Sequence, residues 1–535
     1  MGVPGFFVWL MKNNPRDNII VKSLDCINNL YFDANCLFHP KCFDILKLYS
    51  NITDNDKLED LMIARILKYM QYIIDYVKPS DKIYISVDGV APVAKINQQR
   101  KRRYKSVIDM EFTNKINKKY GVSKNTSWSN IVITPGTPFM KKLDSEIIKY
   151  FKENKKVIYS SYKECGEGEH KIIRYIKQNS KKQRHVIYGL DADLIFLSMS
   201  AQSSINEIYL LRELQHLKKI NMPIMEDVAE PLCYLSIQNV IETYNGYILN
   251  KLRENATIID LDLSRKYDFS KDFIILCFML GNDFIPNLPS IFIRINGIEY
   301  IIEAYCRMFE NTRSYIYSEG CINWQSLMIV YDYIGLVENE FFTTSYNDYK
   351  RMNRYKKCHN INNAYEIELW EHDNLKDIQV DDRIQLGKGD HDEYKFRYYE
   401  HTLNSRINQQ KMIDKVCKNY LEMITWITRY YFDIEMPSWQ YCYYFSNSPF
   451  ASDLKHYLEN HKVNSNIEYK ECIRMETQLS AIIPGYYSGY YSETLKESGV
   501  SCKYMFPIKY ELEYDNKDQY WMCEAKLPVV DFELL

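Results

Sequence analysis

GEGEHKIIRYIKQNSKKQRHVIYGLDADLIFLSM, residues 166–199, combines a helical pattern, a strand pattern and four acidic side chains in one short segment. Ile172, Ile173 and Ile176 recur at helical spacing and predict a helix, whereas the apolar run HVIYGL predicts a buried strand. In open α/β sheets, ligands bind in the crevice at the carboxyl ends of the strands. We therefore expect an α/β fold whose functional crevice holds Glu167, Glu169, Asp191 and Asp193.

Two earlier apolar runs also end in an aspartate. NNLYFDAN ends near Asp33, and KIYISVDG ends at Asp88. A single aspartate after a strand is usually a helix cap or a turn residue. Three such strands and the glutamate pair favour a metal site, because clustered carboxylates repel one another unless a cation lies between them. Mg²⁺ or Mn²⁺, which prefer oxygen ligands, are the expected ions.

A further carboxylate and a basic helix extend this pattern. DFIILCFMLGNDFIPNLPS predicts a buried helix that ends at Gly281, with Asp283 as a candidate seventh acid. Six of the eleven residues from Lys95 to Lys105 are basic. Lys95, Gln99, Arg102 and Arg103 fall on one helical face, which suits a phosphate group. A solvated charged face and a nuclear-localisation patch are the alternatives, but the patch begins only seven residues after Asp88.

Composition limits the class of protein. The chain has 535 residues, enough for more than one domain, and a net charge of −2, so nucleic acid must be bound by a local basic patch. The 14 cysteines form no CxxC pair, which indicates reduced thiols in a cytosolic or nuclear protein. We find no secretory signal and no apolar run of the roughly 18 residues needed to span a membrane.

Helical patterns dominate after about residue 230. Residues 108–120 predict a polar helix that projects from the body, and residues 340–395 predict long connections with little regular structure. An aromatic loop near residues 437–453 contains Trp439 and Tyr441. Such a cluster is usually part of a core, and the alternative is a surface that stacks nucleic-acid bases. His39 is likewise either a loop residue or part of the site.

The motifs MGVPGFF, DGVAPVAKINQQRKRRYK, ITPGTPFM, GEGEHKI, YGLDADLI and FMLGNDFIPNLPS together resemble the Xrn family of 5′→3′ exoribonucleases. The resemblance covers nearly the whole chain as the family's catalytic core. It implies a PIN/flap-nuclease-like mixed sheet flanked by helices over residues 1–230. A largely helical domain over residues 231–535 would contribute Asp283 and the aromatic loop. The resemblance also leads us to expect a minimal core without the family's long carboxyl-terminal extensions, such as a large DNA virus encodes.

The resemblance also implies an activity: processive hydrolysis of single-stranded RNA from a 5′ monophosphate, releasing nucleoside 5′-monophosphates, in mRNA turnover after decapping. Two Mg²⁺ ions, with Mn²⁺ as a substitute, would be held by the matching acids: Asp33, Asp88, Glu167, Glu169, Asp191, Asp193 and Asp283. Lys95, Gln99, Arg102 and Arg103 would bind the 5′ phosphate, and His39 and Trp439 would stack the leading bases. The aromatic loop departs from the family pattern SWxWYYPYHYAP at Tyr441, Ser446 and Asn447.

The expected protein is a cytoplasmic monomer, with the nucleus as the alternative compartment. It needs no nucleotide cofactor, since no P-loop is present. Three other functions stay open on the sequence. One is a flap-type DNA nuclease with a similar acid cluster. The second is a phosphohydrolase with an aspartyl nucleophile, suggested by the spacing of Asp191 and Asp193. The third is an RNA-binding scaffold with an impaired site.

Overall fold

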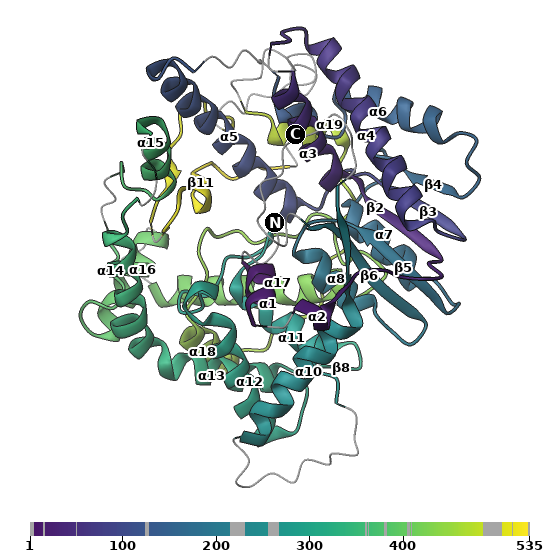
Figure 1. Ribbon diagram of the computed structural model, residues 1–535. Coiled ribbons are helices and arrows are strands. Elements are labelled where there is room, and N and C mark those ends of the chain that lie inside the picture. Colours follow the sequence, from purple (N-terminus) through teal and green to yellow (C-terminus); the bar gives the residue numbers. More distant parts are fainter. Residues whose placement is uncertain are drawn as a thin grey trace.

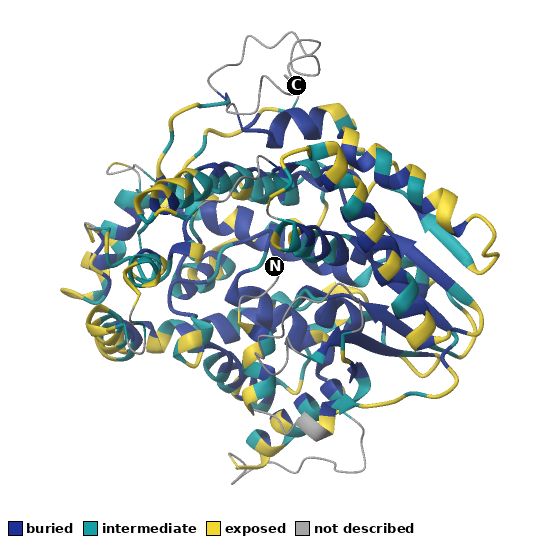
Figure 2. Ribbon diagram, turned by 45° about the horizontal axis from the view of Figure 1, so that its top comes forward, coloured by how far each residue is buried: buried dark blue, intermediate teal, exposed yellow. Residues whose placement is uncertain are grey.

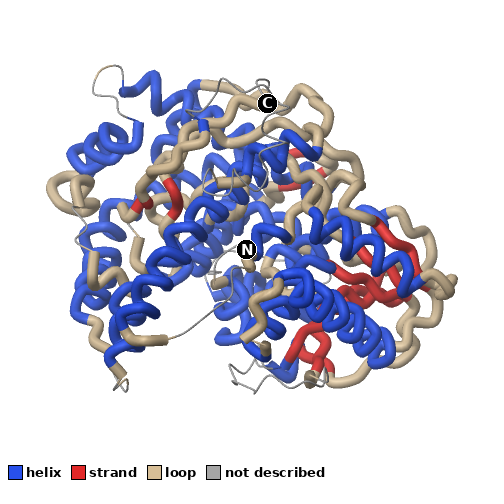
Figure 3. Tube along the Cα trace, turned by 90° about the horizontal axis from the view of Figure 1, so that it is seen from above, coloured by secondary structure: helices blue, strands red, loops and turns tan. Residues whose placement is uncertain are grey.

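A computed structural model describes residues 5–13, 16–49, 51–122, 128–214, 230–254, 267–358, 361, 363–378, 382–403, 407, 409–484, 505–515 and 517–532. A sheet fills one side of the molecule, and helices make up most of the remainder (Figure 1). The same division is visible from above, where most of the strands cluster at one end and only short ones lie among the helices (Figure 3). This arrangement confirms the predicted α/β sheet followed by a largely helical part.

The main sheet has seven strands in the order β1-β7-β6-β5-β2-β3-β4. Strands β4, β3, β2, β5 and β6 run parallel, while β7 and β1 pair antiparallel at one edge. The strands are β1 (Ile20–Val21), β2 (Asn29–Asp33), β3 (Lys82–Ser86), β4 (Val157–Ser160), β5 (Gln183–Tyr188), β6 (Asn206–Glu213) and β7 (Leu232–Ser236). The chain builds outward from β2 to β4 and then returns to β5 on the other side of β2. The strand order therefore reverses between β2 and β5, where open α/β sheets form their ligand crevice.

Helices cover both faces of this sheet, so β2 is buried along its whole length and β5 is buried from His185 to Tyr188 (Figure 2). Leu30 and Phe32 pack with the helices of one face, and Tyr31, which points the other way, packs with those of the opposite face. The first face carries α3 (Ala34–Leu48), α4 (Asn55–Val77) and α6 (Pro138–Phe151). The second carries α7 (Gly168–Lys177), α8 (Asp193–Ala201) and α10 (Ile237–Glu254), whose apolar side chains continue into the core of the helical part.

The amino-terminal helices lie where the sheet meets the helical part. α1 (Phe6–Asn13) precedes the short α2 (Arg16–Ile19). Phe6 packs on Phe196 of α8 with ring centroids 4.5 Å apart, and the Trp9 indole donates a hydrogen bond of 2.8 Å to Glu299. These contacts dock α1 at the edge of the core.

The second half of the chain is helical. Its helices are α11 (Ser270–Cys277), η2 (Phe278–Leu280), η3 (Ile293–Ile295), α12 (Gly297–Thr312), α13 (Trp324–Phe341), the π-helical turn η4 (Phe342–Tyr346), α14 (Asn347–Tyr355), α15 (Ala364–Asp373), α16 (His391–Leu403), α17 (Gln409–Phe432), α18 (Ala451–Asn460), α19 (Met475–Ile482) and η7 (Tyr520–Met522). Two small hairpins join β8 (Tyr317–Ser318) to β9 (Cys321–Ile322) and β10 (Leu512–Glu513) to β11 (Glu524–Ala525). The expectation of irregular connections over residues 340–395 is wrong, because η4, α14, α15 and α16 occupy most of that range. A domain boundary after residue 230 stays a prediction, and β7 follows it directly.

The basic segment is one long helix rather than two. α5 (Val93–Lys119) is continuous through the residues expected to form a separate projecting helix. Its far end is covered by α15, since Phe112 stacks on His372 at 3.5 Å and Tyr365 donates a hydrogen bond to Asn117. None of the helices described is both long and apolar enough to cross a bilayer.

Candidate active site

The predicted acids lie at the carboxyl ends of neighbouring strands. Asp33 is the last residue of β2 and Asp88 follows β3 by two residues. After β5, Asp191 precedes α8 and Asp193 begins it. Glu167 and Glu169 flank the first residue of α7. Each acid thus stands near a helix amino terminus, where unpaired backbone N–H groups favour negative charge.

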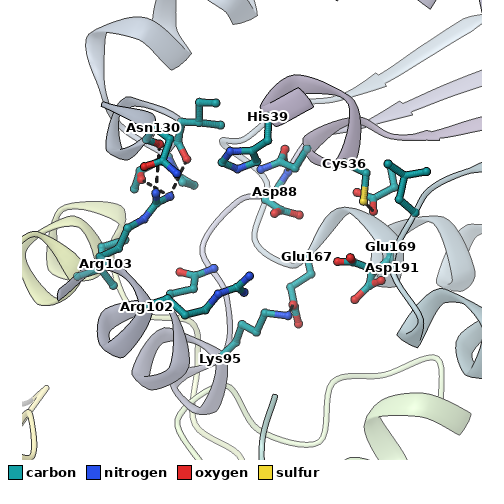
Figure 4. A pocket seen from close by; sticks show the side chains of 18 of the residues that line it. Cys36, His39, Asp88, Lys95, Arg102, Arg103, Asn130, Glu167, Glu169 and Asp191 are labelled. Carbon is teal, nitrogen blue, oxygen red and sulfur yellow. Dashed lines mark hydrogen bonds and ion pairs between the residues drawn. The ribbon is translucent and has the colours of Figure 1, made fainter. Parts of the chain in front are cut away.

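A cavity of about 520 Å³ opens at this edge of the sheet. Its lining includes Asp33, Cys36, His39, Phe43, Asp88, Lys95, Gln99, Arg102, Arg103, Asn130, Thr134, Glu167, Glu169 and Asp191. Acidic side chains gather at one end, and the arginines of α5 lie across from them (Figure 4). The cavity brings together five of the seven predicted acids and all four predicted phosphate residues. Asp193, Asp283 and Trp439 are not among its lining residues.

Gly168 allows the two strand-end aspartates to approach α7. Its backbone N–H donates a hydrogen bond of 2.6 Å to Asp88 Oδ1. A Cβ atom at Gly168 would lie 2.9 Å from Asp33 Oδ1 and 3.3 Å from Asp88 Oδ1. The glycine therefore keeps both aspartates close to the turn that carries Glu167 and Glu169 (the glutamate turn, residues 166–169), within one compact cluster.

The cluster holds more negative charge than its protein surroundings neutralise. Burial, and then the charge of Asp88, raises the pKa of Asp33 from 3.8 to about 8. Burial also raises the pKa of Asp193 to about 7 and that of Glu169 well above its ordinary value. Glu169 Oε2 and Asp193 Oδ1 are buried and accept no hydrogen bond from any residue that the structure describes. These oxygens lack the partners that buried polar atoms normally have.

Lys95 is the main protein cation among the acids. Its Nζ lies 2.6 Å from Glu167 Oε2 and 2.6 Å from Asp283 Oδ2, and all three side chains are nearly buried. Burial alone would lower the pKa of Lys95, but the carboxylates around it raise that pKa well above the ordinary value. Burial would raise the pKa of Asp283, but the charge of Lys95 outweighs the effect of burial and holds that pKa below the usual range. Lys95 thereby connects Asp283, from the helical part, to the cavity.

The arginines differ in how firmly they are held. Arg103 donates hydrogen bonds to the carbonyl oxygens of Asn130 at 3.1 Å and Ile133 at 3.2 Å, and to Thr134 Oγ1 at 3.2 Å. Arg102 is exposed at the cavity mouth and reaches Gln98 at 3.5 Å. Arg103 thus has a fixed orientation, whereas Arg102 can turn toward an incoming anion.

The donor set fits a hard divalent cation. The seven acids offer only carboxylate oxygens, the ligands that Mg²⁺ and Mn²⁺ prefer. A cation would also favour the ionised forms of Asp33 and Asp193, whose pKa values are raised by burial and then by neighbouring carboxylates. As they stand, however, no three Asp, Glu, His or Cys side chains of the described ranges surround a common metal position. Lys95 instead lies between Glu167 and Asp283.

Comparison with known families settles the relationship. The model of the XRN 5′-3′ exonuclease N-terminus matches residues 1–214, and that of the Xrn1 helical domain matches residues 261–369 and 359–535. The chain belongs to the XRN family. The matched ranges include all seven acids and the basic helix face, and the resemblance drawn from the motifs is confirmed.

Curated relatives agree with this assignment. The human protein named 5′-3′ exoribonuclease 1 is 26% identical over 599 aligned positions, which cover 99% of this chain and 33% of the relative. 5′-3′ exoribonuclease 2 of Kluyveromyces lactis is 30% identical and is matched by 65% of this chain over 40% of its own length. 5′-3′ exoribonuclease 1 of Saccharomyces cerevisiae is 31% identical, with 63% of this chain aligned to 23% of the relative. The XRN-family chain thus spans less than half the length of these relatives.

The two expected stacking residues lie in different settings. His39 lines the cavity, and burial together with the charges of Arg103 and Arg102 lowers its pKa to about 3, so its ring is neutral. The Trp439 side chain is buried against Gly166. The backbone carbonyl of Trp439 accepts a hydrogen bond from Val93 N, and its backbone N–H donates one to Lys470 O. The structure therefore brings His39 to the cavity and places Trp439 behind the glutamate turn.

Sequence reasoning missed several side chains that hold the acids. Tyr430 of α17 donates a hydrogen bond of 2.9 Å to Glu167 Oε1 while its ring stacks on His170. Arg212 donates to the backbone carbonyl of Asp191 at 2.8 Å, and Cys36 donates to Asp33 Oδ2 at 2.8 Å. Tyr430 and Arg212 lie in ordinary helix and strand patterns, so only the folded chain reveals their partners. Cys36, three residues after Asp33 at the start of a helix, is the one that spacing alone could have indicated.

Proposed function

We propose that this XRN-family chain is a 5′→3′ exoribonuclease that releases nucleoside 5′-monophosphates from 5′-monophosphorylated single-stranded RNA. One observation carries the proposal: a single cavity has an acid cluster at one end and two arginines at the other. The acids suit metal-dependent phosphodiester hydrolysis, and the arginines suit a terminal phosphate. The names of the curated relatives support the same activity.

The acids would hold two Mg²⁺ ions, for which Mn²⁺ could substitute. Asp33, Asp88, Glu169, Asp191, Asp193 and Asp283 are the proposed ligands, and Glu167 either joins them or orients them. Bound metal would activate a water as the nucleophile and stabilise the oxygen that leaves. Lys95 neutralises Glu167 and Asp283 in the metal-free protein, and we infer that it turns toward the substrate phosphate when metal takes over that charge.

The basic face of α5 would select the end of the RNA. Arg103 is held by Asn130, Ile133 and Thr134, so it offers a pre-oriented guanidinium. Arg102 and Gln99 complete the lining on the same helix face. A 5′ hydroxyl lacks the charge that these groups bind, and a cap adds bulk beyond the single phosphate group that this helix face suits. The neutral ring of His39 suits stacking on a base, and Trp439 would take part only if the glutamate turn moved on RNA binding.

The broader setting is also part of the proposal. Stacking and backbone contacts that read no sequence would permit processive removal of successive nucleotides. Such an activity would serve mRNA turnover after decapping, in the cytoplasm or alternatively the nucleus, by a monomer without a nucleotide cofactor. An α/β domain that ends near residue 230 would carry most of the acids, and the helical domain would supply Asp283.

The test uses one RNA sequence prepared with a 5′ monophosphate, a 5′ hydroxyl or a 5′ cap. We expect mononucleotides from the monophosphate form alone, in Mg²⁺ and not in EDTA. Arg102→Ala should narrow the preference for monophosphate over hydroxyl, whereas Arg307→Ala, an exposed arginine paired with Glu303, should leave it unchanged. Internal cuts, or preference for branched DNA over RNA, would support a flap-type nuclease instead. RNA binding without hydrolysis in Mg²⁺ or Mn²⁺ would support a scaffold with an impaired site.

A further inference from the structure

Two cysteines from distant parts of the chain meet beside the acid cluster. Cys165 directly precedes the glycine of the glutamate turn, and Cys472 lies in the segment between α18 and α19. The two thiols are hydrogen-bonded to each other. Cys165 is exposed and Cys472 is partly exposed, so reagents in solution can reach the pair.

The backbone around the two thiols is held from both sides. Gly166 pairs with the segment after β3, since its N–H donates to Val90 O at 2.8 Å and its carbonyl accepts from Gly89 N at 2.9 Å. A Cβ atom at Gly166 would lie 3.7 Å from the Trp439 ring, so the glycine packs against that ring. On the other side, Trp439 N donates to Lys470 O at 3.0 Å.

A neighbouring contact fixes the second cysteine further. The Gln440 amide donates a hydrogen bond of 2.9 Å to the carbonyl of Glu471, the residue before Cys472. These contacts hold the segments that carry the two thiols beside each other, independently of the thiols themselves. A disulfide requires sulfurs about 2.04 Å apart, so the hydrogen-bonded thiols must approach each other further before one can close.

We propose that Cys165 and Cys472 form an oxidisable dithiol, a modification site at which a peroxide closes a disulfide between the glutamate turn and the helical part. The exposed Cys165 thiol loses its proton, and the thiolate attacks one oxygen of hydrogen peroxide and becomes a sulfenic acid. The O–O bond breaks, and the hydroxide that leaves takes up the proton from the thiol to give one water. The Cys472 thiol then attacks that sulfur, and the hydroxyl leaves with a proton as a second water. Two thiols lose two electrons in total, peroxide gains them, and a thiol reductant reverses the step by exchange.

The position of the bridge gives it a consequence, which rests on the proposed nuclease function. Cys165 is two residues from Glu167, and Glu167 shares Lys95 with Asp283. Cys472 is close to the loop that holds Trp439 against Gly166. A covalent link therefore locks the glutamate turn against the helical part, and we expect the oxidised form to hydrolyse RNA more slowly than the reduced form.

The first experiment detects the dithiol without any activity assay. The reduced protein is treated with phenylarsine oxide, which condenses with two adjacent thiols and releases one water, and intact mass is recorded. We expect one tightly held adduct, lost in Cys165→Ser and in Cys472→Ser but kept in Cys321→Ser, an exposed thiol in the β8–β9 hairpin. An adduct that survives both single variants would overturn the assignment.

The second experiment tests the disulfide and its effect. After limited hydrogen peroxide and alkylation, peptide mapping should show a cross-link between Cys165 and Cys472 that dithiothreitol removes. Overoxidation of Cys165 without a cross-link would contradict the proposal. RNA hydrolysis should slow on oxidation and recover on reduction in the wild type, and stay constant in Cys472→Ser. An unchanged rate in the cross-linked wild type would refute the regulatory part, whereas a protein inactive even when reduced would refute the proposed function and leave the cross-link result intact.

Discussion

Replacing Asp193 by asparagine should stabilise the metal-free protein at alkaline pH while it abolishes hydrolysis. Asp193 is buried, its Oδ1 accepts no hydrogen bond from the residues described, and burial raises its pKa to about 7. The folded protein therefore binds this proton more tightly than the unfolded chain does. The stability that Asp193 contributes is complete below its ordinary pKa of 3.8 and is lost as the pH rises through about 7.

The size of the effect follows from the same values. The difference between 3.8 and about 7, at roughly 1.36 kcal/mol per pH unit, corresponds to about 4 kcal/mol against the ionised form at pH 8. The asparagine amide would be buried there without a hydrogen-bond partner, and leaving it unpaired costs about 1–3 kcal/mol. We therefore expect Asp193→Asn to raise the free energy of unfolding by about 1–3 kcal/mol at pH 8 in EDTA, and by about zero at pH 5.

Thermal or urea unfolding in EDTA at pH 5 and pH 8 measures this difference. Asp272 supplies the matched control, because it is a buried aspartate whose carboxylate accepts hydrogen bonds from Tyr305, Ile316 and Tyr317. Burial raises the pKa of Asp272 only to about 6, and its asparagine variant loses accepted hydrogen bonds, so Asp272→Asn should gain less stability between pH 5 and pH 8 than Asp193→Asn does. Adding Mg²⁺ at pH 8 should stabilise the wild type more than Asp193→Asn. Destabilisation of Asp193→Asn at pH 8 in EDTA would refute the claim that the acid cluster carries surplus charge.

Three other changes probe the same site. Lys95→Met leaves Glu167 and Asp283 buried without their cation, and should cost about 3–5 kcal/mol in urea unfolding without metal, part of which Mg²⁺ restores. If Mg²⁺ restores nothing, those acids do not bind it. Gly168→Ala should lose hydrolysis and weaken Mg²⁺ binding in calorimetry, because the new Cβ collides with the Asp33 carboxylate, whereas Gly246→Ala, with open space around its Cβ, should retain both. The Mg²⁺ concentration that gives half of the maximal stabilisation of the wild type should decrease as the pH rises from 6 to 8. Asp33 and Asp193, with pKa values of about 8 and 7, must lose their protons before they bind the metal, and a concentration that does not change with pH contradicts this.

The parts of the fold that follow local rules were predictable. Apolar runs that end in Asp33, Asp88 and Asp191 identified the strands and the edge at which they meet, because parallel strands deliver their carboxyl ends to the same side. The spacing of Lys95, Gln99, Arg102 and Arg103 likewise placed four side chains on one face, and all four line the cavity. These inferences need only the periods of a helix and a strand.

Contacts between distant segments were not predictable in this way. One of the two partners of Lys95 is Asp283, 188 residues later, and no local pattern indicates that pair. Residues 340–395 are polar enough to suggest loops. The helix α16, which begins in this range, has little apolar periodicity, yet it is held by its buried residues Tyr394, Tyr398 and Tyr399. The far half of α5 appeared free to project because its cover, α15, lies about 250 residues away in sequence. In each case tertiary packing outweighs local preference.

A comparison of one RNA in circular and linear form tests the central claim, that hydrolysis begins at a 5′ end held by the basic face of α5. The circle is the ligated form of the same 5′-monophosphorylated molecule, so both share sequence and length, and the circle has one further phosphodiester bond in place of the two ends. In Mg²⁺ the account predicts complete conversion of the linear RNA to nucleoside 5′-monophosphates while the circle stays intact. Degradation of the circle at a comparable rate would contradict the account, because the arginines of the cavity would then not act on a 5′ end.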